Sequence, residues 1–125
     1  MNELQIRQMQ ISIAKDEIRC CNELNQIYGL TLTEDDITEL VELRGQALRS
    51  TGRVEFGGGI LPKLIRAFCK SPYVDPYNYA ATLGDLQDAF YYFKNESHDL
   101  FSDDDLIEFM EKVFNGQAHG STDVL

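Results

Sequence analysis

Apolar residues recur at intervals of three and four along most of this chain, which is the spacing that places side chains on one face of an α-helix. In the segment that follows Thr33, this stripe consists of Ile37, Leu40, Val41 and Leu48. Thr33 can cap the helix start together with Asp36, in the manner of a capping box, and Gly52 stands where a left-handed residue would end it. The pattern therefore predicts a helix between Thr33 and Gly52.

Three later segments carry similar stripes. The first follows three glycines and runs to about residue 70, with Pro62 in its first turn, where no backbone donor is lost. The next begins after Asp75-Pro76 and runs to about Glu96, and the last begins after Ser102 and stops at Asn115-Gly116. The apolar positions of the three segments are Ile60, Leu61, Leu64, Ile65, Phe68 and Cys69, then Tyr79, Leu83, Leu86, Phe90 and Phe93, then Leu106, Phe109, Met110, Val113 and Phe114.

The start of the chain is ambiguous. Met9, Ile11 and Ile13 alternate as in a strand, whereas Ile11, Ala14, Ile18 and Cys21 suit a helix. We expect an irregular or extended arm over residues 1–14, then a helix from about Asp16 to Tyr28 that ends at Gly29.

Amphipathic helices joined by short connections must pack on one another to bury their stripes. The fold class predicted for residues 1–125 is therefore a single all-α domain, a compact bundle of about five helices, with a flexible tail over residues 117–125.

The formal net charge of −10 is unevenly distributed. Residues 1–43 carry a net charge of −6 and residues 71–125 a net charge of −9, whereas residues 44–70 carry +5. Such acidity repels nucleic-acid phosphates and anionic membranes, so we expect neither as a partner. No segment reaches the length of a membrane helix, the first ten residues lack an export signal, and three cysteines, two of them adjacent, fit a reducing compartment. These features predict a cytoplasmic protein.

The glycine run inside the basic stretch is the sharpest candidate for a ligand site. Backbone amides of Gly57, Gly58 and Gly59 could approach an anion closely, at the start of a helix and between Arg53 and Lys63. The spacing matches neither a Walker A loop nor a dinucleotide fingerprint. The alternative is a turn that reverses the chain, which is what glycines mark more often.

Other candidate chemistry has simpler explanations. The basic residues of 44–70 can pair with the acidic flanks or be solvated. The acidic run Asp103-Asp104-Asp105 lies in what looks like an EF-hand, but leucines occupy the required glycine and glutamate positions, and a helix cap explains it. His98 and His119 form no paired metal spacing. We therefore assign no catalytic residue, metal or cofactor, and consider an enzyme the less favoured interpretation.

Tyrosines cluster around the segment that ends near Glu96. Tyr77, Tyr91 and Tyr92 could line a partner interface, where tyrosine is enriched. The alternative is a wide buried face whose hydroxyls reach solvent.

Three runs of the chain, GRVEFGGGI (52–60), FYYFKNES (90–97) and SDDDLIEFM (102–110), resemble a family of small hypothetical proteins of unknown function from anaerobic Gram-positive bacteria. The resemblance extends from about residue 20 onward and implies a bacterial cytoplasmic protein, with no catalytic residues to transfer. From the residues we predict a non-enzymatic protein-interaction or regulatory module, with a protein partner or self-association. The alternative is a small anion- or nucleotide-binding protein that uses the glycine turn.

Overall fold

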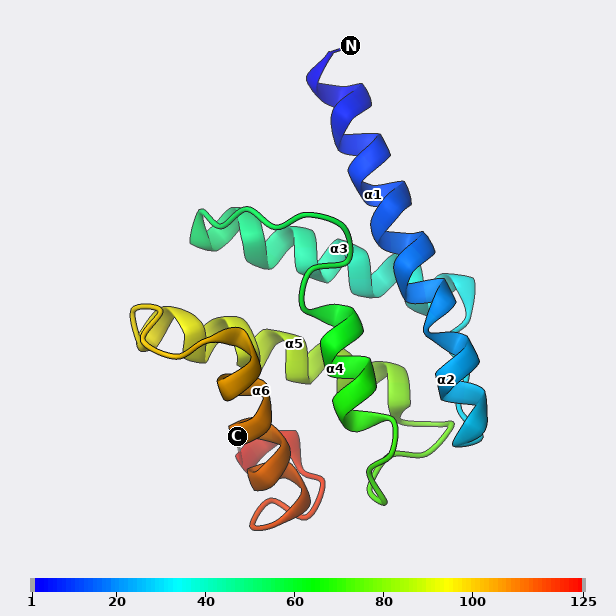
Figure 1. Cartoon of the computed structure of the whole chain (residues 1–125), viewed down its shortest axis with the longest axis vertical. Coiled ribbons are helices and arrows are strands. Elements are labelled where there is room, and N and C mark those ends of the chain that lie inside the picture. Colours follow the sequence, from blue (N-terminus) through cyan, green and yellow to red (C-terminus); the bar gives the residue numbers. More distant parts are fainter. Residues whose placement is uncertain (1, 125) are drawn as a thin grey trace.

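The structure of the protein is a computed structural model that describes residues 2–124. Met1 of the expected arm and Leu125 of the expected tail lie outside the described residues. Within this range the chain contains no strand, which confirms the predicted all-α bundle (Figure 1). Its helices are α1 (Glu3–Cys20), α2 (Asn22–Ile27), α3 (Glu34–Thr51), α4 (Leu61–Phe68), α5 (Tyr79–Glu96), α6 (Asp103–Asn115) and the 3-10 turn η1 (Thr122–Val124).

The expectation of an irregular or extended N-terminal arm is wrong, because the arm is helical from Glu3 onward. The Asn2 side chain accepts the amide of Gln5 at 2.8 Å, and the Gln5 side chain accepts the amide of Asn2 at 3.1 Å. This capping box satisfies two backbone donors and starts the helix. α1 then runs to Cys20, where a single residue, Cys21, separates it from the short α2.

The predicted caps of α3 and α6 are confirmed. The start predicted directly after Asp75-Pro76 is not, because the Asp75 carboxylate accepts two amides of a turn and α5 begins only at Tyr79. The Thr33 hydroxyl accepts the amide of Asp36 at 3.1 Å, and the Asp36 carboxylate accepts the amide of Thr33 at 2.9 Å. Gly52 ends α3 at a φ of 69°, in the left-handed region that glycine adopts at little cost. Ser102 caps α6 through the amide of Asp105.

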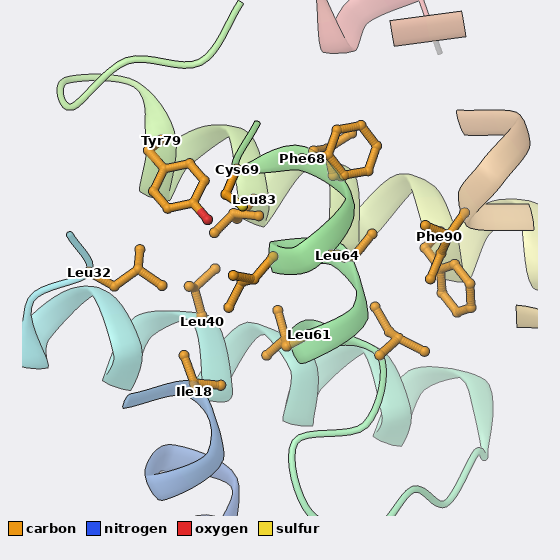
Figure 2. Close-up of a cluster of buried hydrophobic side chains, with 14 of the residues drawn as sticks. Ile18, Leu32, Leu40, Leu61, Leu64, Phe68, Cys69, Tyr79, Leu83 and Phe90 are labelled. Carbon is orange, nitrogen blue, oxygen red and sulfur yellow. The ribbon is translucent and has the colours of Figure 1, made fainter. Parts of the chain in front are cut away.

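The core is built around α4, which packs against α1, α5 and α6 (Figure 1). Its Leu61, Leu64, Ile65 and Phe68 side chains are fully buried. Figure 2 shows Leu61 on the side of α4 that faces α3, and Cys69 beside Tyr79 and Leu83 of α5. Because α4 has only eight residues and is covered on several sides, it contributes to the fold through packing and not through its own helical stability.

Residues 118–122, part of the flexible segment expected over 117–125, are packed against the preceding helices. Ala118 is buried, and its amide donates to the carbonyl of Val113 at 2.9 Å. Gly120 continues this return to α6, since its amide donates to the carbonyl of Phe114 at 2.8 Å. The hydroxyl of Thr122 then donates to Asp85 of α5 at 3.0 Å. Backbone hydrogen bonds that a short polar segment makes with the preceding helix therefore order it.

Buried polar groups link α2 to α5. The Tyr79 hydroxyl donates to Oδ1 of the fully buried Asn25 at 2.7 Å, and Asn25 Nδ2 donates to Asn22 at 3.0 Å. Burial raises the pKa of Tyr79 far above its usual value, so the hydroxyl remains a donor. A satisfied buried network of this kind fixes how the two helices meet.

From the central position of α4 we predict how a substitution in it changes the free energy of unfolding. Leu64→Ala removes a fully buried side chain, and we expect it to lower the free energy of unfolding by about 2–5 kcal/mol. The matched control is Leu100→Ala, the same change at a side chain that is 77% exposed, for which we expect a change within about 0.5 kcal/mol. Urea denaturation followed by circular dichroism measures both, and equal losses would contradict the assigned core.

Candidate functional site

The glycine turn before α4 holds a carboxylate that belongs to the protein itself. The amide of Gly58 donates to Oε2 of Glu17 on α1 at 2.7 Å. Gly57 and Gly59 on either side have φ values of 57° and 59°, in the left-handed region. The turn thus uses the affinity of exposed glycine amides for anions, and the anion that it contacts in this structure is the side chain of Glu17.

The three glycines leave no room for side chains. A Cβ atom at Gly57 would lie 2.5 Å from Oε1 of Glu17, and one at Gly58 would lie 2.9 Å from Oε2 of Glu17 and from Cγ of Pro62. A Cβ atom at Gly59 would lie 1.9 Å from Oε1 of Glu55. Close approach of two carboxylates, together with two positive φ values, therefore requires glycine here.

Behind the turn, a buried cation, a carboxylate and a tyrosine form a small network. Oε1 of Glu55 accepts the hydroxyl of Tyr91 at 2.7 Å and Nε of Arg44 at 3.3 Å. Arg44 and Tyr91 are buried, and Glu55 is about four-fifths buried. Burial, with the negative charge of Glu55, raises the pKa of Tyr91 far above its usual value. Tyr91 therefore remains protonated and donates to the carboxylate.

Arg53 and Lys63, the two cations expected beside the glycine turn, are both engaged with other elements. Arg53 Nε donates to Oδ1 of Asn95 at 2.8 Å, and its guanidinium pairs with Asp99 and lowers the pKa of that carboxyl. Lys63 Nζ lies 2.8 Å from Oδ1 of Asp104 on α6, and lowers the pKa of Asp104. The structure places Arg53 with Gly57 at the edge of one groove and Lys63 in a separate hollow beside α6. It does not bring the two cations together.

The groove that includes Arg53 lies between α1, α3 and the segment that leads to the glycine turn, and has a volume of about 610 Å³. Five basic residues and two acidic residues line it, so its net charge is +3 in a chain whose net charge is −10. The basic residues are Arg7, Lys15, Arg44, Arg49 and Arg53. We refer to this feature as the basic groove.

The extended arm predicted over residues 1–14 would not have placed the α1 residues of the basic groove together on one side. Arg7, Ile11 and Lys15 line the groove, and in a helix an interval of four residues places them on one face. The sequence signal was available in Asn2 and Gln5, whose spacing is that of a capping box. With that helix start identified, the three groove residues of α1 fall on one stripe.

The expected interface tyrosines lie in three different environments. Tyr77 is almost fully exposed in the turn before α5, and Tyr92 is exposed near the end of that helix. The two are separated by about 20 Å of helix, at 1.5 Å per residue. Tyr91 is buried in the network with Glu55 and does not reach the surface. A role of Tyr77 or Tyr92 in an interface stays a prediction.

Cysteine and metal chemistry find little support in the part of the chain that the structure describes. Burial raises the pKa of both Cys21 and Cys69, which disfavours their reactive thiolate forms. Within residues 2–124, no group of three or more histidine, cysteine, aspartate or glutamate side chains is arranged to hold a metal ion. None of the helices in that range combines the length and the apolar character needed to cross a membrane.

We expect a side chain at Gly59 to lower the stability of the protein for two reasons: the backbone conformation of Gly59 and its close contact with Glu55. Gly59→Ala forces a left-handed alanine, at about 1–2 kcal/mol, and displaces Glu55 from Arg44 and Tyr91, which adds about 1–3 kcal/mol. Gly52→Ala is the matched control, because Gly52 has a similar φ of 69° with no atom within 4 Å of its added Cβ. Chemical denaturation should show the larger loss of stability for Gly59→Ala, and equal losses would refute the packing described here.

Tyr91 and Tyr92 are adjacent in the chain, but we expect loss of their hydroxyl groups to affect stability differently. Tyr91→Phe removes the 2.7 Å hydrogen bond to Glu55, and we expect a loss of about 1.5–3 kcal/mol in the free energy of unfolding. Tyr92→Phe makes the same change at a side chain that is 61% exposed, and we expect a change within about 0.5 kcal/mol. Thermal and urea unfolding measure both variants, and a neutral Tyr91→Phe would contradict the network.

Comparison with known proteins places the chain in a family without assigning it an activity. No curated protein and no solved structure matches it. The model of one family of unknown function, DUF6323, matches residues 17–125. That range includes Glu17, the glycine turn and the Arg44–Glu55–Tyr91 network, and it agrees with the resemblance to a family of unknown function noted from the sequence. The bacterial origin implied by that resemblance stays a prediction. Because the match covers most of the sequence, the chain belongs to this family of unknown function.

Proposed function

We propose that the protein is a non-enzymatic protein-interaction module that pairs with a second copy of itself through helix α1. The observation that carries this proposal is the exposure of five large apolar side chains between residues 4 and 13 of α1. Their exposed fractions lie between 39% and 60%, and the residues are Leu4, Ile6, Met9, Ile11 and Ile13. Exposed apolar surface gathered on one element is typical of a site of association.

Three of these residues form a stripe on the free side of the helix. Ile6, Met9 and Ile13 are separated by three and then four residues, the spacing of a seam between paired helices. Ala14 and Ile18, which are buried against the body of the protein, lie on a different face of α1. Figure 1 shows the N-terminal part of α1 extending past the other helices, where a partner helix has access to it.

Charge favours a second copy as the occupant of this stripe. Two chains that each carry −10 repel one another over most of their surfaces. α1 is an exception, since its three acids (Glu3, Asp16, Glu17) are balanced by three bases (Arg7, Lys15, Arg19). A neutral helix with an apolar stripe is therefore a place where two such acidic chains can meet with little electrostatic cost.

The test is the mass of the protein in solution. We expect the wild-type chain to shift from monomer to dimer with rising concentration, in light scattering after size exclusion and in sedimentation velocity. Ile6→Glu combined with Ile13→Glu puts two charges on the stripe, and we expect it to weaken pairing by at least about tenfold, because each half-buried isoleucine contributes about 1 kcal/mol or more to the contact.

The matched control is Gln8→Glu combined with Ser12→Glu. It adds the same two charges to the same exposed part of α1 but leaves the apolar stripe intact, so we expect pairing within about threefold of wild type, corrected for long-range repulsion by salt. A wild-type chain that stays monomeric up to about 1 mM would overturn the proposal. Equal weakening by both double variants would show that charge, and not the stripe, controls association.

A further inference from the structure

The basic groove is distinct from the free stripe of α1, because Arg7, Ile11 and Lys15 lie on the groove side of that helix. Much of its positive charge has no partner in the protein. Of the five basic residues that line it, Arg53 pairs with Asp99 and Arg44 with Glu55. Among residues 2–124, no carboxylate lies within 4.0 Å of the charged groups of Arg7, Lys15 or Arg49.

Arg44 in the groove wall is a buried cation with too few acceptors. The residue is 94% buried, yet its guanidinium makes a single hydrogen bond in the described structure, the 3.3 Å contact from Nε to Glu55. Nη2 is enclosed and has no acceptor among the described residues. The oxygen that Nε contacts is shared with Tyr91 at the shorter distance of 2.7 Å. Nη2 lies beside Gly59, 3.0 Å from a Cβ atom placed there, and not at the groove surface. Buried arginine donors are normally satisfied, so the positive charge of Arg44 in the groove wall is only partly compensated by Glu55.

The groove therefore carries uncompensated positive charge, and the remainder of its wall indicates what kind of anion fits it. Ile11, Val41, Leu48 and Val54 line the groove alongside the cations. A volume of about 610 Å³ falls within the range of small-molecule sites, which combine apolar walls with a few polar anchors. Arginine suits phosphate because its fork of donors matches two phosphate oxygens at once. Three further unpaired cations suit a group that carries two negative charges.

We propose that the basic groove binds a small organic phosphate, a phosphorylated metabolite of up to nucleotide size. The phosphate group lies toward Arg44 and Arg49, and the organic part lies against Ile11 and Val54. The acidic remainder of the chain repels long polyanions such as nucleic acid, whereas a small ligand meets only the local field of the groove. This site differs from the glycine turn, where Glu17 already occupies the amide of Gly58.

The test is binding of defined probes to the full chain. Isothermal titration and thermal unfolding would compare adenosine monophosphate, ribose phosphate, inorganic phosphate, adenosine and sulfate at constant ionic strength. We expect saturable binding and a higher melting temperature with the two organic phosphates, weaker binding of inorganic phosphate, and none of adenosine or sulfate. Backbone amide shifts in NMR should change along α1 and α3, on the groove side.

Arg49→Gln and Arg66→Gln form a matched pair of variants. Both arginines are exposed, and neither has an ion-pair partner among residues 2–124, but only Arg49 lines the groove. We expect Arg49→Gln to weaken binding of the organic phosphates about tenfold, as befits one charge-assisted hydrogen bond, and Arg66→Gln to stay within about twofold. Arg44→Lys, which keeps the charge but loses the fork, should weaken binding at least as much, and its melting curve without ligand reports whether it folds.

Several results would overturn the assignment. These are the absence of saturable binding at millimolar concentrations, equal effects of sulfate and phosphate, or equal losses for Arg49→Gln and Arg66→Gln. Binding of inorganic phosphate as tight as that of the esters would refute the organic class. The Ile6→Glu, Ile13→Glu variant should retain saturable binding of the organic phosphates as a monomer, so failure of self-association and failure of ligand binding are separable.

Discussion

The close contact between the glycine turn and two carboxylates is the constraint on which most of this structure depends. Gly58 holds Glu17 of α1, and Gly59 leaves the space that Glu55 needs to reach Arg44 and Tyr91. The same turn delivers the chain into α4, the helix at the centre of the core. One tight segment therefore contacts α1, α3 and α5: a side chain at Gly57 or Gly58 would disturb the contact with Glu17 of α1, and one at Gly59 would disturb the network of Glu55 with α3 and α5.

The charges of the chain organise the fold more than they stabilise it. Three of the six basic residues in the middle of the sequence pair with the acidic C-terminal part, as Arg53–Asp99, Lys63–Asp104 and Lys70–Glu111. These pairs are largely exposed, and each contributes little to stability. Arg44–Glu55 is different, because removing two charges from water has a cost that one 3.3 Å hydrogen bond offsets poorly. A buried pair of this kind sets geometry, and here it leaves the charge of Arg44 only partly compensated in the wall of the basic groove.

Local signals in the sequence were enough to predict the fold class but not the site. Thr33, Gly52 and Ser102 identify helix ends because a cap depends on neighbours within three or four residues. Contacts such as Glu17 with Gly58, 41 residues apart, leave no trace in local spacing. Adjacent tyrosines show the same limit: helical geometry requires Tyr91 and Tyr92 to face different directions, but only the position of Glu55 decides which one is buried. At the glycine turn the carboxylate that the structure shows belongs to the chain itself, and binding of an external anion there stays a prediction.

The two proposed activities both involve α1, and each uses a different face of that helix. Arg7, Ile11 and Lys15 close the basic groove, while Ile6, Met9 and Ile13 face away from it. A rigid helix cannot be held on one face without restricting the other, so a partner on the free stripe also fixes the distance between α1 and α3 that shapes the groove. Thermodynamic linkage then requires that a groove ligand alter the affinity for the partner by the same factor by which the partner alters the affinity for the ligand. Because Ala14, Glu17 and Ile18 anchor the C-terminal part of α1 to the body of the protein, such coupling would act on the N-terminal part of the helix.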